Sequence, residues 1–159
     1  RVIACDPYIP PEQFTAAGAE PVSFDELLFR SDVLSIHTPL TDETRGMFGE
    51  AELQRMKPTA VLVNTARGPI VSNAAVLKAL REGWIAGAGL DVLEQEPAPP
   101  DEPLLSEPKA IITPHIAWYS ERSIVELQQK AAEEVVRVLS GQRPRNPVNP
   151  EVQPRAVAH

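Results

Sequence analysis

Short apolar segments alternate with helix-like patterns along most of the chain. Each segment is rich in β-branched, leucine or small residues and ends at a turn, which is typical of buried parallel strands. The predicted strands cover residues 2–5, 33–37, 60–64, 85–90 and 110–113. Strands that alternate with helices favour right-handed βαβ units. The pattern therefore predicts an α/β fold in which a doubly wound parallel sheet carries helices on both faces.

Helix-capping residues separate the predicted strands. Ser23 precedes a glutamate by three residues, which is the spacing of a capping box. Ser72 is the predicted N-cap of a helix that ends at Gly83. The longest predicted helix begins after Ser120 and ends at Gly141, with its apolar residues on one face. Shorter helices are predicted between Pro10 and Gly18 and at residues 50–56.

Composition narrows the class of protein. The chain has 159 residues, 43% of them hydrophobic, which suits one globular domain with a core of its own. Its net charge of -7 and the lack of any run of lysine or arginine disfavour nucleic acid and anionic membranes as partners. No apolar stretch approaches a membrane span, and no signal-peptide pattern opens the chain. The single cysteine, Cys5, favours a buried thiol in a reducing compartment, so we predict a cytoplasmic protein.

The first candidate for chemistry is Arg67, in the turn that follows the predicted strand at residues 60–64. Ligands of open α/β sheets bind outside the carboxyl ends of the strands, and the forked guanidinium of arginine suits a carboxylate. The alternative is that Arg67 is a surface residue at a turn, because exposed arginines need no special role. Spacing alone leaves both interpretations open.

Asp6 ends the first predicted strand, near the start of the chain. A Rossmann domain has there an acidic residue that binds the ribose of adenosine and disfavours the 2′-phosphate of NADP. The sequence Asp6-Pro7 is also a plain turn signal, and no G-x-G-x-x-G occurs in the chain to support the ribose role. Gly87 and Gly89 imitate part of that motif, but no helix follows them, so they indicate close packing of a strand.

Glu96 and His115 are the remaining polar candidates. His115 follows the proline that ends the last predicted strand, and Glu96 lies in the preceding loop. A carboxylate beside an imidazole favours the protonated ring, which makes the pair a general acid. The alternative is two loop residues that never meet. We predict no metal site, because Cys5, His37 and His115 lack the spacing of ligands.

With these residues in view, the chain resembles the D-isomer-specific 2-hydroxyacid dehydrogenases. The matching segments appear in the order of the family and cover most of residues 1–150; they are VLSIHTPLTDETRGMF, MKPTAVLVNTARGPIV, LKALREGWIAGAGLDVLEQEP and IITPHIAWYSE. Several long motifs in register are more specific than any one alone. The resemblance implies a Rossmann-type NAD-binding domain that is incomplete at its N-terminal end.

The resemblance also implies a role for each candidate. Arg67 would hold the substrate carboxylate and keto oxygen, and His115, paired with Glu96, would exchange a proton with that oxygen while NAD(H) transfers hydride. Trp118 would form a wall of the substrate pocket that favours an apolar side chain. The positions that match cofactor-binding residues of the family are Asp6, Thr38, Pro39, Thr44, Thr65, Ala66, Asp91 and Ala117.

Domain organisation follows from the same resemblance. Residues 1–145 would be a partial dinucleotide-binding domain that lacks the first strand and the glycine-rich turn, and residues 146–159 a tail that leads towards an absent substrate domain. We expect the fragment alone to be inactive and the full-length protein to be a homodimer acting on a 2-hydroxy acid or 2-oxo acid. Residues 115–121 look like the C-terminal binding proteins, NAD-binding corepressors. An NAD-responsive interaction module with little turnover is therefore the alternative.

Overall fold

The computed structural model of the protein describes residues 1–152, so part of the predicted tail at 146–159 lies outside the described residues. The chain forms two compact units, one spanning Arg1–Ala117 and the other beginning at Trp118. Each unit is described on its own below.

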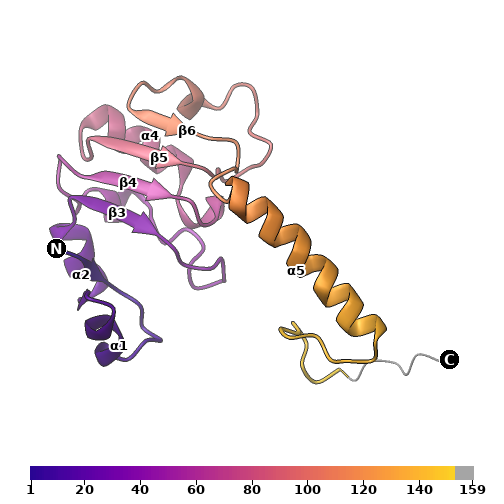
Figure 1. Cartoon of the computed structure of the whole chain (residues 1–159). Coiled ribbons are helices and arrows are strands. Elements are labelled where there is room, and N and C mark those ends of the chain that lie inside the picture. The colour runs from indigo at the N-terminus through magenta and orange to yellow at the C-terminus, as the bar shows by residue number, and fades with distance from the viewer. Residues whose placement is uncertain (153–159) are drawn as a thin grey trace. The chain divides into compact units, whose positions relative to one another are not determined.

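The centre of the first unit is a four-stranded parallel sheet with the order β3-β4-β5-β6. The arrows of these strands lie side by side and point the same way in Figure 1. Pairing in register brings the carboxyl ends of neighbouring strands to the same edge of the sheet, as in the pairing of Asn64 with Leu90. The strands are β3 (Val33–Ile36), β4 (Val61–Asn64), β5 (Gly87–Leu90) and β6 (Ala110–Ile112). The predicted α/β fold with parallel strands is confirmed.

A separate two-stranded parallel sheet joins β1 (Ile3–Ala4) to β2 (Glu20–Pro21). The sequence predicted β1 as a longer strand and missed β2, because glutamate and proline are both poor strand formers. The helix α1 (Pro11–Ala16) connects the two strands and buries Phe14. Glu20 of β2 also forms ion pairs with Arg1 and Arg30.

The helices of the first unit begin and end largely where their capping residues predict. The capping box of Ser23 is formed and begins α2 (Phe24–Arg30). Ser72 caps α4 (Asn73–Glu82), which ends at Gly83 in the left-handed conformation with φ 75°. The helix α3 (Glu50–Leu53) is shorter than predicted. Its last turn tightens, with Met56 N–H bonded to the Leu53 carbonyl, because the residue before a proline disfavours the helical conformation. Two short 3-10 helices, Gly68–Ile70 and Pro103–Ser106, were not predicted.

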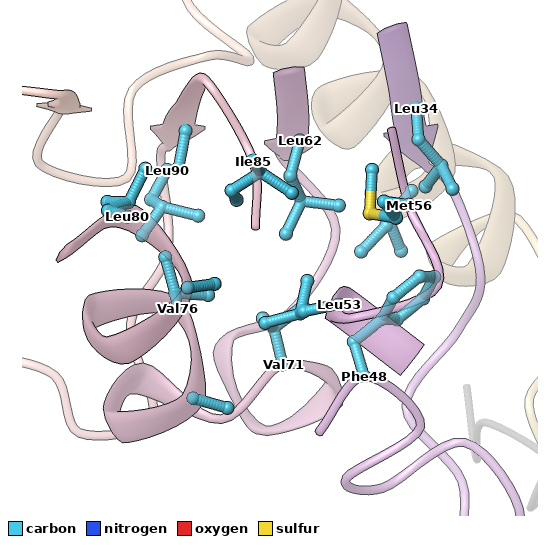
Figure 2. Packing of buried hydrophobic residues seen from close by; sticks show 14 of the residues in the cluster. Leu34, Phe48, Leu53, Met56, Leu62, Val71, Val76, Leu80, Ile85 and Leu90 are labelled. Carbon is cyan, nitrogen blue, oxygen red and sulfur yellow. The ribbon is translucent and has the colours of Figure 1, made fainter. Parts of the chain in front are cut away.

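The core of the first unit lies between one face of the sheet and the helices. Leu62 of β4 and Val76 and Leu80 of α4 are fully buried, and Figure 2 shows these side chains pointing towards one another. Burying an aliphatic side chain of this size contributes about 1.5–3 kcal/mol. This face therefore supplies most of the apolar burial that holds the unit together.

The opposite face of the sheet is much more open in the first unit. Val33 of β3 is 65% exposed and Ile111 of β6 is 73% exposed, while Val61 and Val63 are half-buried. Within residues 1–117 this face of the sheet therefore keeps part of its apolar side chains exposed. The longest predicted helix, α5, belongs to the second unit.

The second unit consists mainly of α5 (Glu121–Leu139), which Ser120 caps through its hydroxyl and which Gly141 follows with φ 75°. None of its side chains is buried. Glu126 pairs with Arg122 and Lys130 along the surface of the helix. Within residues 1–152, no helix combines the length and the hydropathy needed to cross a membrane.

The end of α4 gives a test of the backbone assignment. Gly83 has a positive φ, and no atom lies within 4 Å of a Cβ built there, so a substitution acts through backbone strain alone. Gly83→Val should lower the free energy of unfolding by about 1–2 kcal/mol, because a β-branched residue is strained in the left-handed conformation. Gly83→Asn should lower it much less. Urea denaturation of both variants measures the difference, and equal stabilities would contradict the assignment.

Candidate active site

The turn that carries Arg67 is shaped by the last residue of β4. Asn64 is 1% exposed, and its Nδ2 donates a hydrogen bond of 3.0 Å to the carbonyl of Arg67. Its Oδ1 accepts a hydrogen bond of 3.0 Å from the N–H of Ala66. We call residues 64–68 the Arg67 turn. One buried amide thus closes this turn from both sides.

Arg67 itself is exposed at the carboxyl edge of the sheet. Its Nη1 donates a hydrogen bond of 2.6 Å to the carbonyl of Ala66. Within residues 1–152, Arg67 has no acidic side chain at ion-pair distance, although most other arginines of the chain do. A guanidinium in this state is well suited to an anionic ligand.

Gly68 places the Arg67 turn directly against the loop that follows β5. A Cβ added to Gly68 would lie 1.8 Å from the carbonyl oxygen of Leu93, a distance no side chain tolerates. The requirement for glycine here is therefore one of space. The same loop carries Glu96, whose Oε1 accepts a hydrogen bond of 3.2 Å from the N–H of Leu93.

The side chains of Glu96 and His115 are in contact, as the interpretation of these residues as an acid–base pair predicted. The Nδ1 of His115 lies 2.9 Å from the Oε2 of Glu96. Their side chains are 46% and 39% exposed, respectively, so the pair faces solvent rather than the core. With Glu96 ionised, Nδ1 is the donor, which fixes the orientation of the imidazole ring. The arrangement is that of a general acid or base held by a carboxylate.

The loop that carries His115 is anchored on Asp91, the first residue after β5. The N–H of Ile116 donates to Oδ1 of Asp91 and the N–H of Ala117 to Oδ2, each over 2.9 Å. The hydroxyl of Thr113 donates to Oδ1 over 2.5 Å, and the N–H of His115 bonds to the Asp91 carbonyl over 2.9 Å. This clasp holds His115 at φ 55°, a conformation that few residues other than glycine adopt.

The electrostatic state of Asp91 follows from its surroundings. Burial disfavours its ionised form, but the hydrogen bonds from Thr113, Ala117 and Ile116, together with the nearby imidazole of His115, outweigh burial. They hold the pKa of the Asp91 carboxyl below its usual range. Asp91 was predicted to be a cofactor-binding residue, and that role stays a prediction; in this structure its carboxylate binds the loop that carries His115.

A cavity of about 760 Å³ adjoins the pair of Glu96 and His115. Its polar wall includes those two side chains and Asp91, and its apolar wall includes Leu93 and Leu104. Arg67 is not among the residues that line it. The cavity therefore lies beside the acid–base pair and under the loop between β5 and β6.

The other predicted cofactor residues follow the ends of β1, β3, β4 and β6, of which β1 belongs to the separate two-stranded sheet. Asp6 is exposed after β1, and Thr38 and Pro39 follow β3. Thr44 braces the loop after β3 by donating to the Pro39 carbonyl over 2.6 Å. The remaining positions, which lie in the Arg67 turn and in the loop after β6, are Thr65, Ala66 and Ala117. Such an edge suits a dinucleotide, which binds outside the carboxyl ends of parallel strands.

Two further predictions concern Trp118 and metals. Trp118 lies in the second unit, where its ring makes an edge-to-face contact with Tyr119 at 5.9 Å between centroids. Its role in a substrate pocket stays a prediction. Across residues 1–152, no group of three or more histidine, cysteine or acidic side chains could hold a metal ion.

Sequence reasoning missed three residues that build this site. It assigned no role to Asn64, Gly68 or Thr113. An asparagine as the last residue of an apolar strand was the available signal for Asn64, because a buried amide needs hydrogen-bond partners. Nothing local marks Thr113 or Gly68, whose partners lie 22 or more residues away.

Residues 1–117 match a family model described as "D-isomer specific 2-hydroxyacid dehydrogenase, NAD binding domain". The chain belongs to this family. It is 50% identical to the glyoxylate reductase of Korarchaeum cryptofilum over 135 residues, which are 85% of this chain and 41% of that protein. It is 40% identical to the D-3-phosphoglycerate dehydrogenase of Archaeoglobus fulgidus over 155 residues, 97% of this chain and 29% of that protein. The chain thus spans less than half the length of these relatives.

Solved structures agree with the family assignment. The D-lactate dehydrogenase of Lactobacillus jensenii with NAD+ has a TM-score of 0.83 and 31% identity, covering 93% of this chain and 48% of that one. The holo form of the D-mandelate dehydrogenase of Rhodotorula graminis has a TM-score of 0.85 and 32% identity, covering 97% and 45%. The predicted Rossmann-type, NAD-binding fold is confirmed. The resemblance of residues 115–121 to the corepressor branch stays a prediction.

Asp91→Asn tests the anchoring of the His115 loop. Because the folded pKa of Asp91 is lowered, its contribution to stability is fully present above its unfolded pKa of about 3.9 and is lost as the pH falls through the folded value. The variant should be less stable by about 1–3 kcal/mol at pH 7, and the difference should shrink below about pH 4. Urea titrations at several pH values measure it.

Asp32→Asn is the matched control for this measurement, because Asp32 is exposed and its one ion pair within residues 1–152 is with Lys57 at the surface. It should change the free energy of unfolding by less than about 1 kcal/mol. If the loss in Asp91→Asn is the same at pH 7 as well below pH 4, the anchoring role of the ionised carboxylate is wrong.

Proposed function

We propose that these residues belong to an NAD-dependent oxidoreductase that interconverts a 2-hydroxy acid and its 2-oxo acid. The observation that supports this most strongly is the acid–base pair, in which His115 Nδ1 lies 2.9 Å from Glu96 Oε2. Family membership supports the reaction class, and the names of the relatives, such as glyoxylate reductase, support small 2-oxo acids as substrates. The substrate is held partly by a domain that we propose follows or precedes residues 1–145.

Proton transfer is the task of His115 in this proposal. In the reducing direction the imidazolium gives its proton to the keto oxygen as hydride reaches the carbon, and in the oxidising direction the neutral ring takes that proton back. Nε2 is the atom that exchanges the proton, because Nδ1 is bound to Glu96. The carboxylate of Glu96 stabilises the charged ring and fixes its tautomer. NAD, when bound, supplies or accepts the hydride.

Substrate binding is the task of Arg67. Its planar guanidinium presents parallel donors that fit the carboxylate of a 2-oxo acid, with a further donor for the keto oxygen. The turn that carries Arg67 packs, through Gly68, directly against the loop that carries Glu96. The residues proposed for substrate binding and for proton transfer therefore lie on segments in direct contact. We propose that the strand-end residues Asp6, Thr38, Pro39, Thr44, Thr65, Ala66 and Ala117 face the cofactor.

His115→Ala tests the mechanism in the full-length protein. Removing an essential acid should lower kcat for reduction of a 2-oxo acid by about 10²- to 10⁴-fold. The assay follows NADH oxidation with a panel of 2-oxo acids that begins with glyoxylate and pyruvate. His37→Ala is the matched control, since His37 is an exposed histidine that bonds to Ser35 instead. Undiminished turnover in His115→Ala would rule out the proposed acid.

A further inference from the structure

Asn64 is one of three polar residues buried in the described part of the chain, with Ser31 and Asp91. Ser31 bonds to the end of α2, and Asp91 anchors the His115 loop. We infer that Asn64 is a positioning residue that holds Arg67 in the geometry needed to bind the substrate carboxylate. This inference rests on the proposed function, because it deepens the role given to Arg67.

The side chain of Asn64 determines where the backbone of Arg67 lies. Its Nδ2 donates a hydrogen bond to the Arg67 carbonyl, and its Oδ1 accepts a hydrogen bond from the Ala66 N–H. Both distances are 3.0 Å. A buried amide without such bonds would cost several kcal/mol relative to an apolar residue. The two bonds act on consecutive residues of the turn, so they fix the direction in which the Arg67 side chain leaves the backbone.

The backbone of Asn64 ties the same turn to the rest of the site. Its carbonyl accepts a hydrogen bond of 2.9 Å from the N–H of Asp91, the residue that anchors the His115 loop. On the far side of the turn, Gly68 lies against the carbonyl of Leu93, next to the loop of Glu96. The Arg67 turn is therefore held at both ends by segments that carry the acid–base pair, and Asn64 is the internal brace between them.

A brace of this kind acts on binding geometry more than on folding. Two parallel hydrogen bonds from a guanidinium to a carboxylate require the fork to be aligned, and a misplacement of about 1 Å can lower the rate by about 10²-fold. Among residues 1–152 no acidic side chain forms an ion pair with the exposed guanidinium, and its Nη1 donates a hydrogen bond to the carbonyl of Ala66 within the turn itself. Its alignment must therefore come from the turn beneath it.

The test uses the full-length protein with Asn64→Ala and with Asn64→Asp, which keeps the acceptor but replaces the donor that faces the Arg67 carbonyl. Leu62→Ala is the matched control, because Leu62 is fully buried two residues earlier on the same face of β4 and its aliphatic side chain can donate no hydrogen bond to the turn. In both Asn64 variants, KM for the 2-oxo acid should rise by about 10- to 100-fold. In Leu62→Ala, KM for the 2-oxo acid should change by less than about threefold below the melting temperature of that variant.

A double-mutant cycle shows whether Asn64 acts through Arg67. Asn64→Ala should raise KM strongly in the wild-type background and hardly at all when Arg67→Ala is already present. The inhibition constant of oxamate, an unreactive analogue of a 2-oxo acid, should rise by the same factor as KM. An unchanged KM in Asn64→Ala, an equal effect in the Arg67→Ala background, or a matching effect in Leu62→Ala would each overturn the inference.

Amide hydrogen exchange gives a readout that does not depend on turnover. The Ala66 amide should exchange at least about 10-fold faster in Asn64→Ala than in Leu62→Ala, after correction for global stability. Equal exchange rates of the Ala66 amide in the two variants would contradict the role of Asn64 in holding this turn. If the wild-type protein reduces no 2-oxo acid, the proposed function fails, and the inference about the substrate falls with it. If the wild type is active but KM in the Asn64 variants equals KM in Leu62→Ala, the inference about Asn64 fails while the proposed function stands.

Discussion

The proposed site depends on the hydrogen bonds that the buried carboxylate of Asp91 accepts from the loop of His115. The carboxylate accepts hydrogen bonds from Thr113, Ile116 and Ala117, and the backbone N–H of Asp91 donates to the carbonyl of Asn64 on the neighbouring strand. Such a group is stable in a buried place only when its hydrogen bonds are complete, so each of these bonds supports the others. The strained backbone of His115 persists because this clasp surrounds it.

The parallel sheet explains why so many polar residues reach one edge. Because β4, β5 and β6 run in the same direction and pair in register, their last residues and the loops after them gather at their carboxyl ends. Asn64, Asp91 and Thr113 then lie within hydrogen-bond reach of neighbouring segments, although Asp91 and Thr113, which bond through their side chains, are 22 positions apart in the sequence. One face of this sheet is packed against α3 and α4, which keeps the edge rigid, while the face of Val33 and Ile111 stays open in the first unit.

Much of this arrangement was predictable from local patterns. The capping box of Ser23, the cap at Ser72 and the end of α4 at Gly83 follow from short-range hydrogen bonding and backbone conformation, and all three are present. The strands of the main sheet were predicted because apolar runs of the right length are recognisable in sequence. The strand β2 and the shortening of α3 were missed, since pairing partners and a following proline outweighed the local pattern.

The sequence by itself indicated the strands of the main sheet and the caps of its helices, and through several motifs in register it indicated the family and the residues Arg67, Glu96 and His115. It left open whether those residues meet. Only the tertiary structure decided that Glu96 reaches His115, that Gly68 must be a glycine because Leu93 occupies the space of a side chain, and that Asn64 and Asp91 brace the two loops. The physical reason is that capping and periodicity act over a few residues, whereas contacts between loops depend on strand pairing across the whole sheet.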